Sequence, residues 1–402
     1  MIAKKVSIRS IFDSRDGETI EIEIRDQFGQ SSIASVPSGK SRGANEASVI
    51  SFSTAKRILA GPFGREISRR NFKTITSFDK FLLSYDPTPR KVKIGGNLAL
   101  GLSIAFTRGL AEKNKQKVWQ LLKAEFFKKD KSSPKTPYIF SNLINGGEHA
   151  NNNLAFQEYM VVLLPSANPE KAISNLINLY QDLGTVLTKR IKTKNLALGD
   201  EGGYSLNFKN SLEPISVLEM MIRKEKYRGK FLMALDSAAT SFKTNHGYDF
   251  DGHELGRNQL KEKYLEIFKN HKLLFSIEDP FQEKDYAGFK NLLASSRNRM
   301  VVGDDLTTTN PRYIEKFAKA RFINSCIIKP NQIGTVSESC AAIIVARKNN
   351  VKTIISHRSG ETEDVFIIHL AKASNAFGLK IGAPIKERMI KFNELIRLYA
   401  KK

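Results

Sequence analysis

Seven charged residues stand where short apolar segments in the second half of the chain end. The segments are NLALGDEGG, FLMALDSAA, LLFSIEDP, MVVGDDL, CIIKP, VKTIISHRSG and LKIGAP, and the charged residues are Glu201, Asp236, Glu278, Asp304, Lys329, His357 and Lys380. Acids, lysines and a histidine are the side chains from which sites for acid and base chemistry or for metal-assisted catalysis are built. Whether they form one site depends on the fold that carries them.

Lys329 ends an apolar run, although a lysine is costly to bury. One interpretation is that its side chain leaves the strand and reaches water by snorkelling. The other is that it acts as a base, because a nearby divalent cation and a second lysine disfavour the ammonium form. Such a base suits removal of a proton α to a carboxylate. Lys380 is the second lysine, and Glu201 in GDEGG is the candidate opposing acid.

Three carboxylates, Asp236, Glu278 and Asp304, follow successive apolar runs. At about 4 Å and an effective dielectric constant near 20, each like-charged pair costs about 4 kcal/mol, so the trio requires partial neutralisation or a cation. Carboxylate oxygens with open positions suit Mg²⁺. The alternative is that each carboxylate merely caps the following helix or turn. Because a carboxylate follows each of three successive apolar runs, a metal site is favoured over three separate caps.

A cationic, hydrogen-bonding cluster follows another apolar run. His357, Arg358 and Ser359 together suit a phosphate or a second anion, although a single His or Arg is more often structural. Combined with the lysines and the carboxylates, the cluster indicates metal-assisted acid and base chemistry on a phosphorylated carboxylic acid.

These residues need elements that bring them together, and the rhythm of the sequence predicts such elements. Amphipathic helical stretches separate several of the apolar runs. The clearest is residues 168–191, with Asn168 as N-cap and Pro169 at the first helical position. One face of it carries apolar residues, namely Ile173, Leu176, Tyr180, Leu183 and Leu187. Strand, charged end and helix in repetition are typical of a (β/α)8 barrel, where polar side chains at the C-terminal strand ends share one mouth.

The first part of the chain has a different pattern. SIRSIFDSR and ETIEIEIRD alternate apolar and polar residues as half-buried strands do, and residues 94–122 carry apolar residues at helical spacing. We therefore expect an N-terminal α+β domain over residues 1–127. A polar linker over residues 128–137 leads to a C-terminal α/β barrel domain over residues 138–402.

Bulk composition excludes several classes of protein. Cys326 and Cys340 are too few for a disulfide framework and lack the spacing of a metal site, which fits a reducing cytosol. The start of the chain has no signal-peptide pattern, and no stretch is apolar enough to span a membrane. The formal net charge of +23 would attract anionic molecules, nucleic acid or acidic surfaces. The basic residues are scattered, however, which favours a solvated basic surface.

A series of motifs resembles the enolase (phosphopyruvate hydratase) family, in family order and over nearly the whole chain. The motifs are DSR (Asp13–Arg15), VPSGKSRG, NGGEHANNNLAFQEYM, GDEGG, ALDSAA, SIEDPF, VGDDLTTTNP, KPNQIGT, SHRSGETED and IGAP. The resemblance implies a hydro-lyase of glycolysis and gluconeogenesis that reversibly dehydrates 2-phosphoglycerate to phosphoenolpyruvate with two Mg²⁺. It also implies a cytoplasmic homodimer or higher oligomer, and a small N-terminal domain packed on an eight-stranded barrel whose second strand is antiparallel.

The resemblance also implies roles for individual residues. Lys329 would remove the C2 proton, and Glu201, assisted by Glu158, would protonate the departing C3 hydroxyl. The residues implied to hold metal are Asp236, Glu278 and Asp304 for the first Mg²⁺ and Ser41, in a mobile loop, for the second. The residues implied to bind substrate are Lys380 at the carboxylate, Arg358 and Ser359 at the phosphate, and His149, Gln157 and His357 around the pocket.

Several loops depart from the family pattern. Lys40 and Arg42 flank Ser41 where the family usually has Ala and Thr, so these cations could steer an anionic substrate or obstruct closure of the loop. Glu148 and the run Asn151–Asn153 replace Ser and Gly-rich residues in another loop. Every matched chemical residue is nevertheless present, so we expect an active enzyme with altered loops.

Two other functions stay open on the sequence. The basic surface could make the chain an enolase-like scaffold that acts mainly as a binding protein, at the cell surface with plasminogen or within an RNA-degrading assembly. Salt-sensitive RNA binding that survives loss of Lys329 would support that function. The chain could also be another superfamily member, such as a dehydratase of sugar acids, which a panel of substrates would distinguish.

Overall fold

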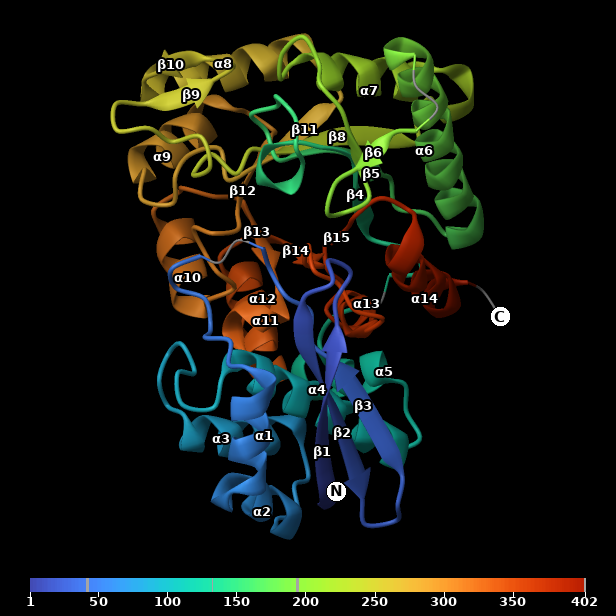
Figure 1. Cartoon of the computed structure of the whole chain (residues 1–402), viewed down its shortest axis with the longest axis vertical. Coiled ribbons are helices and arrows are strands. Elements are labelled where there is room, and N and C mark those ends of the chain that lie inside the picture. The colour runs from blue at the N-terminus through green and yellow to red at the C-terminus, as the bar shows by residue number, and fades with distance from the viewer. Residues whose placement is uncertain (41–42, 132, 193–194, 401–402) are drawn as a thin grey trace.

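The structure is a computed structural model that describes residues 1–40, 43–131, 133–192 and 195–400. Two parts lie along its long axis (Figure 1). A small sheet and its helices occupy one end, and a barrel with surrounding helices occupies the other. Within the described ranges, no helix is both long and apolar enough to cross a membrane.

The first part is built on a three-stranded antiparallel sheet in the order β1-β2-β3. Its strands are β1 (Ala3–Phe12), β2 (Glu18–Asp26) and β3 (Ser31–Ser35). Alternation in β2 buries Ile20, Ile22 and Ile24 on the face that meets the helices. The two strands predicted from SIRSIFDSR and ETIEIEIRD are therefore confirmed.

Helices cover one face of this sheet. They are α1 (Phe52–Ala60), α2 (Pro62–Arg69), α3 (Ile75–Tyr85), α4 (Gly96–Lys113) and α5 (Val118–Phe126). Most residues of α4 are buried because the helix packs against β2 and β3 on one side and against helices of the barrel on another. Gly101 permits this approach, since a Cβ there would lie 2.6 Å from Ile22 Cγ1.

Eight strands of the second sheet close into a barrel. They are β4 (Tyr138–Asn145), β5 (Glu158–Leu163), β8 (Phe231–Asp236), β11 (Leu274–Glu278), β12 (Met300–Gly303), β13 (Ser325–Ile328), β14 (Lys352–Ser356) and β15 (Gly378–Ile381). β15 pairs with β4 and closes the ring. All neighbouring pairs are parallel except those of β5, which runs antiparallel to β4 and β8. The barrel and its antiparallel second strand are as the resemblance implied.

Apolar side chains from alternate strand positions fill the barrel interior. They are Phe140, Met160, Val162, Ala234, Met300, Val302, Ile327 and Ile354. The barrel interior is therefore a packed apolar core and not a channel. Polar side chains that point inward lie beyond this core, at the ends of the strands. The mouth at the C-terminal strand ends is therefore where chemistry can occur.

The helices around the barrel follow the strands along the chain. They are α6 (Pro169–Ile191), α7 (Glu213–Arg223), α8 (Arg257–Asn270), α9 (Tyr286–Ser295), α10 (Pro311–Lys319), α11 (Pro330–Ile333), α12 (Val336–Lys348), α13 (Phe366–Ala373) and α14 (Met389–Tyr399). The helix predicted over residues 168–191 is confirmed as α6. The Asn168 side chain caps it by accepting from Lys171 N at 2.9 Å, and the predicted apolar face is buried.

Shorter elements complete the part of the chain that the structure describes. They are the strands β6 (Ala197–Leu198), β7 (Tyr204–Ser205), β9 (Tyr248–Phe250) and β10 (His253–Leu255), and the 3-10 turns η1 (Gly147–His149), η2 (Glu225–Tyr227) and η3 (Lys386–Arg388).

One of the seven predicted strand segments is wrong. NLALGDEGG does not form a barrel strand, because β6 and β7 are a short antiparallel hairpin beside β4. Ala197 is exposed and Leu198 only half-buried, so the run is too short and too exposed to serve as a wall of the barrel. The other six segments are barrel strands, and β4 and β5 supply the two that the pattern missed.

Loops of the first part of the chain lie over the barrel mouth. Ser14 N donates to Glu361 O at 2.8 Å, and Ser38 and Gly360 exchange two backbone hydrogen bonds of 2.8 and 3.0 Å. In Figure 1 the loop between β1 and β2 reaches toward β14 and β15. The mouth is therefore covered by both parts. The division into domains at residues 127 and 138 remains our proposal.

Candidate active site

A cavity of about 340 Å³ lies at the barrel mouth, and most of the predicted site residues line it. Those on its wall are His149, Gln157, Glu158, Glu201, Asp236, Asp304, Lys329, His357, Arg358, Ser359 and Lys380. Glu278 is buried behind this wall in contact with Lys380. Ser41 lies outside the described residues, as does Arg42.

Strand register explains why the carboxylates meet. Asp236 and Glu278 end the neighbouring parallel strands β8 and β11 and stand opposite each other in register. Glu158 begins β5 rather than ending it. Because β5 runs antiparallel, its first residue lies at the same barrel end and pairs in register with Asp236. The reversal of one strand thus brings Glu158 to the acidic residues of the mouth.

Lys380 lies at the centre of these carboxylates. Its Nζ donates to Asp236 Oδ2 at 3.0 Å and to Glu278 Oε2 at 2.8 Å, and lies 3.2 Å from Glu158 Oε2. Only 3% of Lys380 is exposed. Burial alone would lower the pKa of Lys380, but the surrounding carboxylates raise it well above its usual range. The side chain is therefore a fixed positive charge.

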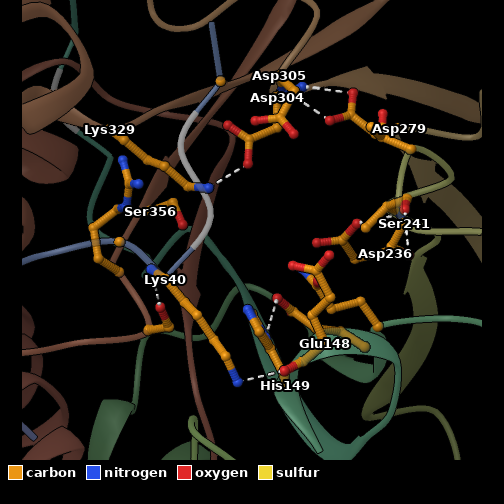
Figure 2. A pocket seen from close by; sticks show the side chains of 18 of the residues that line it. Lys40, Glu148, His149, Asp236, Ser241, Asp279, Asp304, Asp305, Lys329 and Ser356 are labelled. Carbon is orange, nitrogen blue, oxygen red and sulfur yellow. Dashed lines mark hydrogen bonds and ion pairs between the residues drawn. The ribbon is translucent and has the colours of Figure 1, made fainter. Parts of the chain in front are cut away.

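Lys329 faces Asp304 across the pocket wall (Figure 2), and its Nζ donates to Asp304 Oδ2. Burial lowers the pKa of Lys329, but Asp304 outweighs this and raises it above the usual value. Asp304 thus favours the ammonium form of Lys329, and the expected effect of a bound divalent cation on this lysine stays a prediction. The Lys329 backbone is also held, since its N–H donates to Thr309 Oγ1 at 2.8 Å.

Glu201 and Glu158 form a buried acidic pair beside two histidines. Glu201 Oε1 lies 3.4 Å from His357 Nε2 and 3.8 Å from His149 Nδ1. Asn142 Nδ2 donates to the other oxygen, Oε2, at 3.1 Å. The side chains of this group converge on one wall of the pocket.

The members of the acidic pair titrate in opposite directions. Burial raises the pKa of Glu158 well above its usual range, and the charge of Glu201 adds to the effect. Burial also opposes ionisation of Glu201, but the two histidines and Lys380 hold its pKa well below the usual value. Burial lowers the pKa of His357 to about 4, so the imidazole is neutral near pH 7. These opposite shifts favour a proton on Glu158 over one on Glu201.

Arg358 is held between the two parts of the chain. Its Nη1 lies 3.0 Å from Glu46 Oε2 and donates to Asn331 Oδ1 at 3.1 Å. Gly39 passes so close that a Cβ there would lie 1.7 Å from Arg358 Nη2. The hydroxyl oxygen of Ser359 accepts from Lys40 N at 3.1 Å. A guanidinium and a hydroxyl in this arrangement suit a phosphate.

Lys40 reaches across the pocket, as Figure 2 shows. Its Nζ donates to the carbonyl oxygen of Glu148 and lies 3.1 Å from Asp200 Oδ2. This residue, one of the departures from the family pattern, thus connects a loop of the first part to two loops of the barrel.

Buried carboxylates exceed the cations around the pocket, which suits a divalent metal ion. Asp236, Glu278 and Asp304 offer oxygen ligands, the kind that a hard cation prefers. Asp279 lies beside them and accepts from the backbone N–H groups of Asp304 and Asp305 at 3.0 and 2.8 Å (Figure 2). Ligand atoms of Asp279, Asp304 and Asp305 all lie within 4.8 Å of one another. Burial and Asp304 raise the pKa of Asp305 to about 7.

Polar atoms are also left over on the acidic wall. Among the described residues, the buried side-chain atoms Glu158 Oε2, His149 Nδ1 and His357 Nε2 form no hydrogen bond of good geometry, although Glu158 Oε2 is 3.2 Å from Lys380 Nζ. Buried polar groups ordinarily have hydrogen-bond partners, so these atoms are available to a polar ligand.

Sequence reasoning missed five residues of this site. They are Glu46, Asn142, Asp279, Asp305 and Gln332, the last of which donates from Nε2 to Asp304 Oδ1 at 3.0 Å. Asp279 and Asp305 are the second acids in the motifs SIEDPF and VGDDL, so doubled acids at strand ends were an available signal. Gln332 lies in the quoted motif KPNQIGT, which was also an available signal, whereas Asn142 had none, because a single amide is common in any element.

Comparisons with known proteins cover both parts of the chain. The family pattern described as "Enolase, N-terminal domain" matches residues 3–122, and "Enolase, C-terminal TIM barrel domain" matches residues 134–401. The protein named "Enolase 2" from Lactiplantibacillus plantarum is 36% identical, over 99% of this chain and 94% of its own length. "Enolase" from Saccharolobus solfataricus is 35% identical, over 98% of this chain and 95% of its own length. The similarity therefore spans the cavity and the loops that cover it.

Proposed function

Because this chain belongs to the enolase family, reversible dehydration of 2-phosphoglycerate to phosphoenolpyruvate is its reaction, and we propose that Lys329 and Glu201 carry it out. The enzyme is a carbon–oxygen hydro-lyase. Lys329 removes the proton from C2, and Glu201 donates a proton to the C3 hydroxyl. The hydroxyl leaves as water while the C2–C3 double bond forms.

The observation that carries this assignment is a pocket with a lysine on one wall and a proton-sharing carboxyl pair on another. Lys329 lies beside Asp304 (Figure 2). Glu201 and Glu158 both lie beside His149. A base and an acid on different walls can act on two neighbouring carbons of one small substrate. Because the opposite pKa shifts favour the proton on Glu158, Glu158 assists by passing this proton to Glu201, which donates it to the C3 hydroxyl.

The remaining side chains bind the substrate and exclude water. The Lys380 ammonium binds the carboxylate, and Arg358 with Ser359 binds the phosphate. His149, Gln157 and His357 complete the wall around the reacting carbons. Because each of these residues is less than a tenth exposed, their hydrogen bonds act in a medium of low dielectric constant.

Asp236, Glu278 and Asp304 would hold one Mg²⁺. When bound, this ion supplies positive charge for the substrate carboxylate as C2 loses its proton, a pattern already known for enolase-superfamily sites. The second Mg²⁺, the contribution of Ser41, the homodimer and the cytoplasmic location rest on the family resemblance and stay predictions. The comparisons support the enzymatic function, and no observation favours the alternative of a binding protein.

Phosphoenolpyruvate formation, followed by ultraviolet absorbance with Mg²⁺ and again with a chelator, tests the function. We expect turnover with Mg²⁺ and its loss with the chelator. Lys329→Ala and Glu201→Gln should each lower turnover by about 10²- to 10⁴-fold while the circular dichroism spectrum is retained. Lys319→Ala, at an exposed lysine of α10, is the control and should leave turnover unchanged. Near-normal turnover in either site variant would remove the role assigned to that residue.

A further inference from the structure

Arg388, in the turn η3 after β15, is buried at the junction of three segments that build the active site. Only 1% of it is exposed. Its Nη2 donates to Ser359 O at 2.9 Å and to Asp200 O at 3.1 Å, and its Nη1 donates to Ser14 Oγ at 3.4 Å. These acceptors belong to the phosphate-binding segment, to the segment that carries Glu201, and to the loop between β1 and β2.

The same stretch of chain holds Glu201 by its backbone. Ala383 N donates to Glu201 O at 2.9 Å. Gly382 leaves room for this contact, since a Cβ there would lie 2.4 Å from Glu201 O and 2.8 Å from Arg388 Nε. The backbone of Asp200 and Glu201 is thus fixed on one side by Gly382, Ala383 and Arg388.

The Glu201 carboxyl is fixed independently on its other side by Asn142. Two hydrogen bonds hold the backbone that carries this carboxyl, one from Arg388 to Asp200 O and one from Ala383 N to Glu201 O. They therefore determine the position of the Glu201 carboxyl. An acid that transfers a proton in the transition state is sensitive to displacements of about 1 Å, which can cost about 10²-fold in rate.

Arg388 does not itself line the cavity. The planar guanidinium of Arg388 can donate to two acceptors at once. A lysine ammonium on a flexible side chain would make these hydrogen bonds only in part. The hydrogen bonds of Arg388 to two backbone carbonyls therefore set the spacing between two segments.

We propose that Arg388 is a positioning residue for the acid step: by joining Asp200 O to Ser359 O, it fixes the Glu201 carboxyl relative to the bound phosphate. This inference rests on the proposed function. Among the described residues, Lys329, which follows β13, forms no hydrogen bond or ion pair with Arg388, so removal of the C2 proton does not depend on Arg388. Protonation of the C3 hydroxyl, with cleavage of the C3–O bond, does.

Two steps of one reaction can be measured separately in deuterium oxide. Removal and return of a proton by Lys329 introduces deuterium at C2 of recovered 2-phosphoglycerate, whereas loss of water requires Glu201. At saturating substrate and Mg²⁺, we expect Arg388→Met to lower phosphoenolpyruvate formation by about 10²-fold. Deuterium incorporation at C2 should stay within about threefold of wild type, and Arg388→Lys should recover part of the lost dehydration rate.

Lys391 offers a matched control in the next turn of the chain. It is also 1% exposed, and its Nζ donates to Thr362 O at 2.9 Å and pairs with Glu361. Because it does not contact the Glu201 segment, Lys391→Met should lower the melting temperature without changing the ratio of exchange to dehydration.

A parallel loss of exchange and dehydration in Arg388→Met and Arg388→Lys, with their ratio unchanged, would mean that Arg388 only stabilises the fold. Should Arg388→Met fail to fold, Gly382→Ala tests the same contact and should raise the ratio of exchange to dehydration. A wild-type protein that neither exchanges the C2 proton nor forms phosphoenolpyruvate would overturn the proposed function instead.

Discussion

At the scale of single residues, the pocket depends on side chains that orient its carboxylates. Gln332 is buried between the two parts of the chain. Its Oε1 accepts from Thr309 Oγ1 at 2.7 Å, and its Nε2 donates to Asp304 Oδ1 at 3.0 Å and to Glu46 Oε1 at 3.3 Å. Since Thr309 also holds the Lys329 backbone, one amide connects the proposed base to a proposed metal ligand, Asp304.

We predict that Gln332→Leu weakens metal binding. The substitution removes a hydrogen bond that orients Asp304, and loss of such a partner typically costs 10- to 100-fold in metal affinity. The measurement is the Mg²⁺ concentration at the midpoint of a melting-temperature titration, which should rise by about 10- to 100-fold. Turnover at saturating Mg²⁺ is the internal control and should fall far less. An unchanged midpoint would show that Asp304 is oriented without Gln332.

At the scale of elements, Asp364 joins the barrel to the first part of the chain. It accepts from Arg108 Nη1 and Nη2, both at 2.8 Å, and from Ser35 N at 3.1 Å. Arg108 lies on α4, and Ser35 ends β3. Burial would raise the pKa of Asp364, but Arg108 holds it below the usual value. This cluster keeps the small sheet in place over the barrel mouth.

We predict that Asp364→Asn lowers the free energy of unfolding by about 2 kcal/mol near pH 7, because it leaves a half-buried guanidinium without its carboxylate. The lowered pKa means that the ionised form stabilises the fold above the unfolded value of about 3.9, and that this contribution disappears as the pH falls through the folded value. Urea unfolding at pH 7 and at pH 3 should therefore show a smaller difference from wild type at pH 3.

Glu315→Gln provides a control for the Asp364 experiment. Glu315 pairs with Lys319 on the exposed surface of α10, where ion pairs contribute little. The urea midpoint of this variant should match wild type at both pH values. An equal loss in Asp364→Asn at pH 7 and at pH 3 would contradict the role of the ionised carboxylate.

Asp79 on α3 is a buried carboxyl with a shift in the opposite direction. It accepts from Ser103 Oγ on α4 at 2.6 Å and from Ser337 N on α12 at 2.8 Å. Burial raises the pKa of Asp79 from 3.8 to about 6 despite these hydrogen bonds. The folded protein therefore binds this proton more tightly than the unfolded chain does, so the fold loses stability as the pH rises from about 3.8 to about 6.

We predict that the free energy of unfolding of Asp79→Asn increases relative to that of wild type as the pH rises from 4 to 7.5. The raised pKa corresponds to about 3 kcal/mol of destabilisation at neutral pH, which asparagine avoids because it does not ionise. The difference in urea midpoint between variant and wild type, measured at the two pH values, should shift in favour of the variant. A difference that is the same at both pH values would disprove the prediction.

At the scale of the whole molecule, the net charge of +23 is its most distinctive property. A field of this sign raises the local concentration of anionic ligands and their association rate, and salt screens it. The substrate assigned to the pocket carries both a carboxylate and a phosphate. Its capture therefore benefits from the scattered lysines and arginines, even though they do not touch it.

We predict that kcat/KM falls by roughly tenfold as ionic strength rises from about 0.02 to 0.3 M, whereas kcat changes much less. The measurement is initial rates at fixed Mg²⁺ over a range of 2-phosphoglycerate. Tetramethylammonium chloride in place of potassium chloride controls for specific cation binding and should have the same effect. A kcat/KM that does not depend on salt would show that the surface charge plays no part in substrate capture.

The sequence by itself determined the class of fold and most of the pocket. Six strands ending in charged residues, the helix α6 and the two strands of the small sheet follow from periodicity, which is a local property of the chain. Glu201 lies at the mouth although the reason for placing it there, a barrel strand ending at this residue, was wrong; the resemblance of GDEGG to the family motif indicated the same residue.

Only the tertiary structure decided how these residues interact. Periodicity does not encode strand direction, so it could not show that β5 is reversed and brings Glu158 opposite Asp236. It could not show that Asp304 faces Lys329 either, since a pKa depends on neighbours distant in sequence. Asn142 and Arg388 escaped prediction for the same reason. Each is an ordinary polar residue locally, and each acquires its role only from partners that folding brings within hydrogen-bond distance.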